Sequence, residues 1–147
     1  MPADALNYTT DWTDAVLVAV YERLDETEII VDGTAQVVQC YTAVVPNAKL
    51  PYYRLTNPRM VEDGAQQGAS YGGAQEVRIQ LDAFSWEGDT ETVGALKSAA
   101  FQQLADSPLS LDGATVTFAT AEGSSSPPDQ DAEHGVVDLY FRVQPQS

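Results

Sequence analysis

The stretch that decides the fold is QEVRIQLDAFSW, residues Gln75–Trp86, in which apolar and polar side chains alternate. Successive side chains of a β-strand point to opposite faces of a sheet, so this alternation is typical of an antiparallel strand with one buried face. The predicted core face consists of Val77, Ile79, Leu81 and Ala83. The predicted outer face carries Glu76, Arg78, Gln80 and Asp82 and ends in the aromatic residues Phe84 and Trp86.

Two helices are predicted around this strand. The first residue after it that suits an N-cap is Asp89, and the helix that begins there ends before Pro108. Its apolar residues recur at helical spacing, interrupted only by Lys97: Val93, Leu96, Ala100, Phe101 and Leu104. A second helix is predicted nearer the N-terminus, at about Asp11–Leu24, with Thr10 or Asp11 as its N-cap. Its apolar stripe comprises Trp12, Ala15, Val16, Ala19 and Val20.

Further strands are predicted from short runs rich in β-branched and aromatic residues. These runs are Val37–Val45, Leu50–Leu55, Ala114–Ala119 and Val136–Val143. Asp32-Gly33 separates the first run from Ile29–Val31, so either a hairpin or a plain loop is possible there. We expect Pro58 to close the strand that begins at Leu50, because proline cannot donate a ladder hydrogen bond.

These elements predict one α+β domain over residues 1–147, in which an antiparallel sheet of about four to five strands packs against two helices. The chain is long enough to bury a continuous core. Two flexible loops are predicted, a glycine-rich one at about 61–74 and one rich in serine, proline and aspartate at about 121–134.

Charge is the unusual part of the composition, with 22 acidic and 7 basic residues and a formal net charge of −15. Such a field repels phosphate backbones, and the basic residues are scattered, so we expect no specific binding of nucleic acid. No apolar run approaches the roughly 20 residues that span a bilayer, so we expect no membrane association either. Excess carboxylate with little lysine also suits a halophilic host, because salt at 1 M shortens the Debye length to about 3 Å and screens self-repulsion.

No pattern indicates a reaction centre, and we predict no catalytic residue, no cofactor and no metal site. His134 lies beside the acidic loop without a Gly-x-Ser-x-Gly motif and is interpreted as a solvated loop residue. Cys40 has no neighbouring base and is expected to be a small buried side chain. Segment 129–133 alternates carboxylates but lacks the glycine and the last glutamate of an EF-hand loop, so cation binding there stays an open alternative.

The outer face of the long strand is the candidate interaction surface. Phe84 and Trp86 are aromatic residues on an otherwise charged face, and such residues are often interface anchors. They could equally be covered by the helix that begins at Asp89. The predicted contact residues on this face and on the last strand are Arg78, Asp82, Phe84, Trp86 and Arg142.

The order of elements resembles the tail completion or tail terminator proteins of long-tailed viruses. The residues that carry the likeness are Ala43–Pro46 followed by Leu50–Tyr53, Val77–Phe84 leading into the capped helix, and Asp138–Val143. The likeness runs nearly end to end. The chain departs from the usual family pattern between Leu24 and Val37 and in the loop rich in serine, proline and aspartate.

The resemblance implies a structural virion protein, not an enzyme, whose α+β protomers form a ring, with six subunits as the expected number. The ring would end the tail tube and join it to the head connector, so the implied partners are other copies, the tail-tube protein and the connector protein. The implied location is the head-proximal end of the tail, reached from the host cytoplasm during assembly, with DNA passing through the lumen. Two alternatives remain: a connector or head-closure adaptor of the same junction, and a small acidic ligand-binding or hydrolytic domain.

Overall fold

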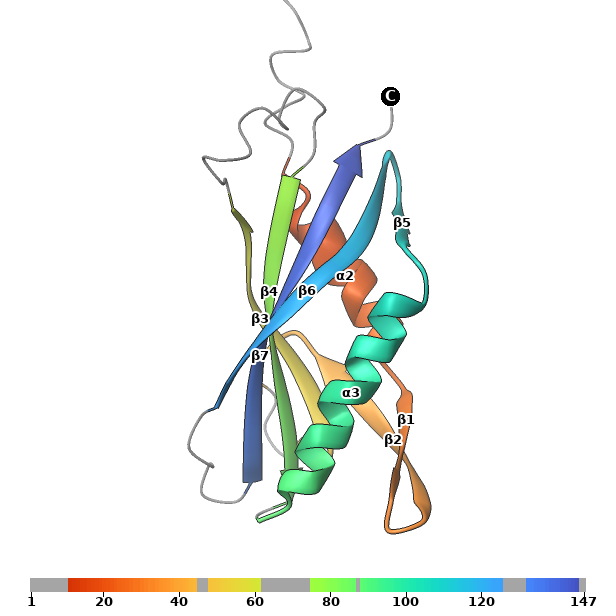
Figure 1. Ribbon diagram of the computed structural model, residues 1–147, viewed down its shortest axis with the longest axis vertical. Coiled ribbons are helices and arrows are strands. Elements are labelled where there is room, and N and C mark those ends of the chain that lie inside the picture. The colour runs from red at the N-terminus through yellow and green to blue at the C-terminus, as the bar shows by residue number, and fades with distance from the viewer. Residues whose placement is uncertain (1–10, 45–47, 62–74, 87, 126–131, 146–147) are drawn as a thin grey trace, which may run out of the picture.

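The computed structural model describes residues 11–44, 48–61, 75–86, 88–125 and 132–145. Within that part of the chain, the helices α2 (Thr13–Leu24) and α3 (Thr90–Asp106) pack on one sheet of seven strands (Figure 1). The strands are β1 (Thr27–Val31), β2 (Thr34–Tyr41), β3 (Tyr52–Val61), β4 (Gln75–Trp86), β5 (Leu109–Leu111), β6 (Ala114–Ser125) and β7 (Ala132–Pro145). The α+β class is confirmed.

The sheet is larger than predicted and is mixed instead of purely antiparallel. Its strand order is β1-β2-β3-β4-β7-β6-β5, and the β2–β3 pair is parallel while the other pairs are antiparallel. The prediction of four to five antiparallel strands was therefore wrong in number and in one pairing. The additional edge strands are β1, which the sequence left open as part of a hairpin, and β5, whose three residues are too few to show alternation.

The core lies between the sheet and the two helices, and the predicted core face of β4 is confirmed. Val77, Ile79, Leu81 and Ala83 are all at most 1% exposed. Leu96, Ala100 and Leu104 of α3 and Val16, Val20 and Leu24 of α2 complete this cluster. The sheet curls around the helices, so that β1 at one edge packs on α3 and β5 at the other packs on α2. Burial of each valine, leucine or isoleucine side chain in this cluster contributes roughly 1.5–3 kcal/mol.

The start of α3 is as predicted. The Asp89 carboxylate accepts a hydrogen bond from the Thr92 backbone N–H at 2.9 Å, and the helix ends at Asp106, two residues before Pro108. The other helix begins at Thr13, later than predicted, with Asp11 accepting from the Thr13 N–H at 2.9 Å. Its buried residues also differ from the predicted stripe, because Thr13 and Leu24 face the core while Ala15 is exposed.

Two predicted strand ends, at Pro58 and at Val45, were wrong. The strand at Leu50–Leu55 does not stop at Pro58, because β3 continues to Val61 after a register shift between Thr56 and Arg59. Asn57 in that bulge has a positive φ of 53°, and a bulge takes Pro58 out of the regular ladder, where its missing N–H would matter. In contrast, β2 stops at Tyr41, short of the predicted Val45.

The two loop predictions have different outcomes. The bounds of the loop at about 121–134 were too wide, because β6 continues to Ser125 and β7 begins at Ala132, while residues 126–131 lie outside the described residues. Of the loop at about 61–74, Val61 belongs to β3 and the rest lies outside the described residues. Asp32-Gly33 makes a hairpin and not a plain loop, with φ of 51° and 77°, the two positive values that a type I′ turn requires.

Candidate interaction surface

We call the outer face the side of strands β3, β4, β6 and β7 that is turned away from α2 and α3, and it carries ion pairs between arginines and carboxylates. It presents four arginines and four carboxylates, and the strands β3, β4, β6 and β7 contribute them. The eight residues are Arg54, Arg59, Arg78, Arg142, Glu76, Asp82, Glu122 and Asp138. This face is therefore balanced in charge, although the chain has a net charge of −15, and the excess acid lies elsewhere.

Asp82 is the centre of a buried polar network on this face. Its side chain is only 1% exposed, forms an ion pair with Arg54 at 3.3 Å and lies within hydrogen-bond distance, 3.2 Å, of the His134 ring nitrogen Nε2. It also accepts a hydrogen bond from the Gln80 amide at 3.0 Å and a longer one from the Thr56 hydroxyl at 3.4 Å. The network joins β3, β4 and β7 and satisfies both carboxylate oxygens, as a buried charge requires.

An aromatic row crosses the same end of the outer face. The Phe84 ring stacks on Tyr52 at a centroid distance of 4.6 Å and on His134 at 4.3 Å, and Tyr41 meets Tyr52 edge-on at 5.7 Å. The Arg54 guanidinium lies 4.9 Å from the Phe84 ring centre. Phe84 is consequently only 2% exposed, and the rings that stack on it come from the neighbouring strands β3 and β7 and not from α3.

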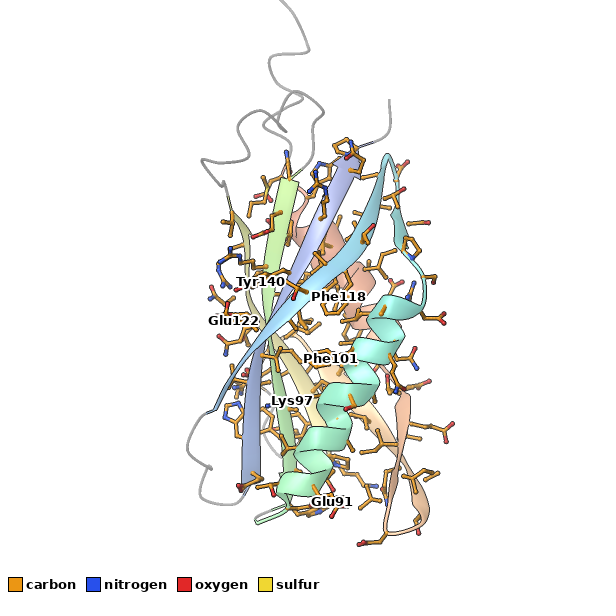
Figure 2. The ribbon with its side chains drawn as sticks, viewed as in Figure 1. Glu91, Lys97, Phe101, Phe118, Glu122 and Tyr140 are labelled. Atoms are coloured by element: carbon orange, nitrogen blue, oxygen red, sulfur yellow. The ribbon has the colours of Figure 1, made fainter. Side chains whose placement is uncertain are left out.

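A second cluster lies further along β4 and β7. The Arg78 guanidinium pairs with Glu76 at 2.7 Å and lies 4.3 Å from the Tyr140 ring centre. The Tyr140 hydroxyl donates to Glu122, and Figure 2 shows these two residues together on the side of the sheet away from α3. The hydrogen bond to Glu122 raises the pKa of the Tyr140 hydroxyl, and the bond to Glu76 raises the pKa of Arg78. These contacts hold the side chains in one arrangement.

Arg142 differs from the other arginines of the outer face. It is exposed, and the described part of the chain offers it neither an ion pair nor a hydrogen bond. Arg59 by contrast approaches Asp138 at 3.6 Å. An unpaired guanidinium in a chain with 22 acidic residues is available to a carboxylate of another molecule.

A profile of the family described as "Tail completion protein gp17" matches residues 18–144. The chain belongs to this family. Among curated proteins no match was found. The tail completion family is one of structural phage tail proteins, so the protein's place is the virion tail, in contact with other proteins of the tail or virion.

The fold brings four of the five predicted contact residues onto one face. Arg78, Asp82, Phe84 and Arg142 all lie there, but Asp82 and Phe84 are buried, so of the two alternatives for Phe84 the covered one holds. Trp86, at the end of β4, is 39% exposed and lines a shallow groove with residues of the β1–β2 hairpin. Whether these residues form an interface stays a prediction.

His134 is the residue that sequence reasoning missed. It belongs to β7 and not to a solvated loop, and its side chain is only 14% exposed. The sequence contained evidence for this position, because alternate residues of a strand point to the same face. His134, like Asp138 and Tyr140, has an even number, whereas the apolar core residues Val137 and Leu139 have odd numbers. Reading the alternation four residues further back places His134 on the outer face.

The described residues contain no group of three or more histidine, cysteine, aspartate or glutamate side chains arranged to hold a metal ion. Segment 129–133, the candidate cation loop, lies largely outside the described residues. Cys40 is 2% exposed, as predicted, and burial raises the pKa of its thiol to about 12, so it is a poor nucleophile at neutral pH. Neither described helix has the length and apolar character needed to cross a bilayer.

Proposed function

We propose that the protein ends the tail tube and joins it to the head connector, as a ring of six copies with no enzymatic activity. The observation that carries the proposal is the family match over residues 18–144, since completing a tail requires a protein at its end. The ordered outer face supports it: its polar side chains are held by one another, as in a surface built for contact.

Subunits of a closed ring meet through two different patches, because the contact is heterologous. We infer that the outer face supplies one of them. Of the predicted contact residues, Arg78, Arg142 and Trp86 are accessible to a partner, whereas Asp82 and Phe84 hold the face rigid from beneath. The partners are other copies of the chain, the tail-tube protein on one side of the ring and the connector protein on the other.

The acidity has a role in this proposal. Six copies with a net charge of −15 carry about 90 negative charges, a field that keeps DNA from adhering as it passes through the lumen. The same field opposes ring closure at low salt and is screened at high salt, so a halophilic host fits this composition. The ring would assemble in the host cytoplasm and remain at the head-proximal end of the virion tail.

The test combines native mass spectrometry of the purified protein with electron microscopy of tail tubes to which the protein is added. A hexamer mass together with rings at one end of the tubes supports the proposal. A monomer that binds only connector-side proteins would contradict it and favour a head-closure adaptor. Stabilisation by calcium without any binding to tubes would contradict it and favour a small ligand-binding domain.

A further inference from the structure

The β1–β2 hairpin, Thr27–Val38, extends beyond the rest of the sheet, and we call it the arm. Within the described chain, residues 34–38 of β2 pair only with β1, whereas residues 39–41 pair with β3. Figure 1 shows the arm beside α3, at the lower right. Ile29 and Val38 are buried on the side of the arm that faces the helix. A two-stranded ribbon by itself is only marginally stable in water, so the arm depends on contacts along its sides.

The free side of the arm carries an apolar patch. Ile30 is 66% exposed and Val37 55% exposed, and the register makes them diagonal neighbours, since Val37 lies opposite Glu28 and Ile30 opposite Ala35. Two of the five large hydrophobic side chains that are exposed in the described chain therefore lie together on this small surface. Exposed apolar residues gathered on a projecting element are typical of a contact site.

The arm is also purely acidic. Glu28 lies on the same side as Ile30 and Val37 and is exposed, and Asp32 lies at the turn. The sequence contains no basic residue between Arg23 and Lys49, so the chain supplies no local countercharge along the arm. A partner for this surface needs apolar area and a positive charge near its centre.

The outer face of the same chain offers that combination. Arg142 is exposed and unpaired within the described chain; Glu76 lies opposite it on β4 but pairs with Arg78, and Tyr140 lies two positions away on β7. In the strand order, β7 lies four positions from β1, so the two surfaces belong to different flanks of the sheet. Such a pair of complementary, non-identical patches is what a head-to-tail contact requires.

We propose that the arm of one copy packs on the outer face of a second copy, with Glu28 facing Arg142 and with Ile30 and Val37 covering the surface beside Tyr140. This contact rests on the proposed ring and specifies its subunit interface. Each copy offers one arm and one outer face, so every subunit uses both patches once and the assembly closes without free patches.

The test is a charge swap measured by mass photometry and analytical ultracentrifugation over a range of protein concentrations. Glu28→Arg and Arg142→Glu should each raise the concentration needed for assembly at least tenfold, because each variant places like charges in contact. The double variant should assemble like the wild type. A 1:1 mixture of the two single variants should also assemble, because an alternating ring of even number restores opposite charges at every contact.

Matched controls separate the contact from general effects of charge and hydrophobicity. Lys49→Glu makes the same charge change as Arg142→Glu at another exposed position and should leave assembly unchanged. Ile30→Ser and Val37→Ser should weaken assembly, whereas Val18→Ser, at a valine 52% exposed on α2, should not. Circular dichroism and thermal unfolding of each variant at low concentration confirm that the fold is retained.

Three outcomes would overturn the inference. If both charge variants assemble and cap tubes like the wild type, the arm contact is wrong while the proposed function stands. If the arm variants form rings that no longer bind tubes, the arm's partner is the tail-tube protein and not a second copy. If the wild-type protein is a monomer that does not bind tail tubes, the inference and the proposed function are both wrong.

Discussion

Removing the Asp82 carboxylate should destabilise the fold far more than removing any surface carboxylate of the same sheet. In Asp82→Ala, Arg54 and His134 lose their common partner, and the amide of Gln80 and the hydroxyl of Thr56 lose an acceptor. Breaking a fully buried ion pair costs about 3–5 kcal/mol. The Arg54 side chain is 22% exposed and water can partly solvate it, so we expect a loss of about 2–3 kcal/mol in the free energy of unfolding.

The matched control is Asp138→Ala. Asp138 pairs with Arg59 on the same outer face at 3.6 Å, but the two side chains are 37% and 33% exposed, so the loss should be at most about 1 kcal/mol. Urea denaturation followed by circular dichroism, at one protein concentration, measures both values. Equal losses in the two variants would refute the argument that the burial of Asp82, and not the number of ion pairs, stabilises this face.

Three further predictions concern the N-cap of α3 at Asp89, the close packing of Gly135 against α3, and the buried thiol of Cys40. Asp89→Ala should lower the free energy of unfolding by about 1 kcal/mol, and Asp89→Asn should lower it by less. Because hydrogen bonds from Thr92 lower the pKa of Asp89, the stabilisation should be complete above about pH 4 and should be lost as the pH falls through the lowered pKa. Thermal unfolding at several pH values measures this dependence. Gly135→Ala should cost about 1–3 kcal/mol, because a Cβ there would lie 2.5 Å from the Val93 side chain, whereas Gly123→Ala meets nothing within 4 Å; equal unfolding midpoints would contradict this. The Cys40 thiol should not react with a thiol reagent at pH 8 until urea unfolds the protein, and rapid reaction of the native protein would show that the thiol is accessible.

The sequence was sufficient for the parts of the fold that follow from local periodicity. The core face of β4, the stripe of α3 and the cap at Asp89 each depend on residues a few positions apart, and all three were predicted from them. The predicted end of β3 at Pro58 was wrong because a bulge takes this residue out of the regular ladder, where its missing N–H would matter. A bulge depends on the partner strand and not on the local sequence alone.

The candidate site was predictable only in part, for a physical reason. Alternation assigns Asp82 and Phe84 to the outer face, but their exposure depends on what the neighbouring strands place beside them. Arg54 on β3 and His134 on β7 bury both, and these strands come from segments about 30 and 50 residues away along the chain. A single sequence does not contain that pairing, so it also could not show that Arg142 is left exposed.

The most direct test of the central claim is the length of tail tubes grown from purified tube protein in the presence of this protein. If the protein ends the tube, tubes imaged by electron microscopy should stop growing as the protein is added, and each arrested end should carry a ring. Glu28→Arg, which our proposal makes defective in assembly, should leave tubes as long as those grown without the protein. Tubes that elongate equally with and without the wild-type protein, with bare ends, would contradict the account.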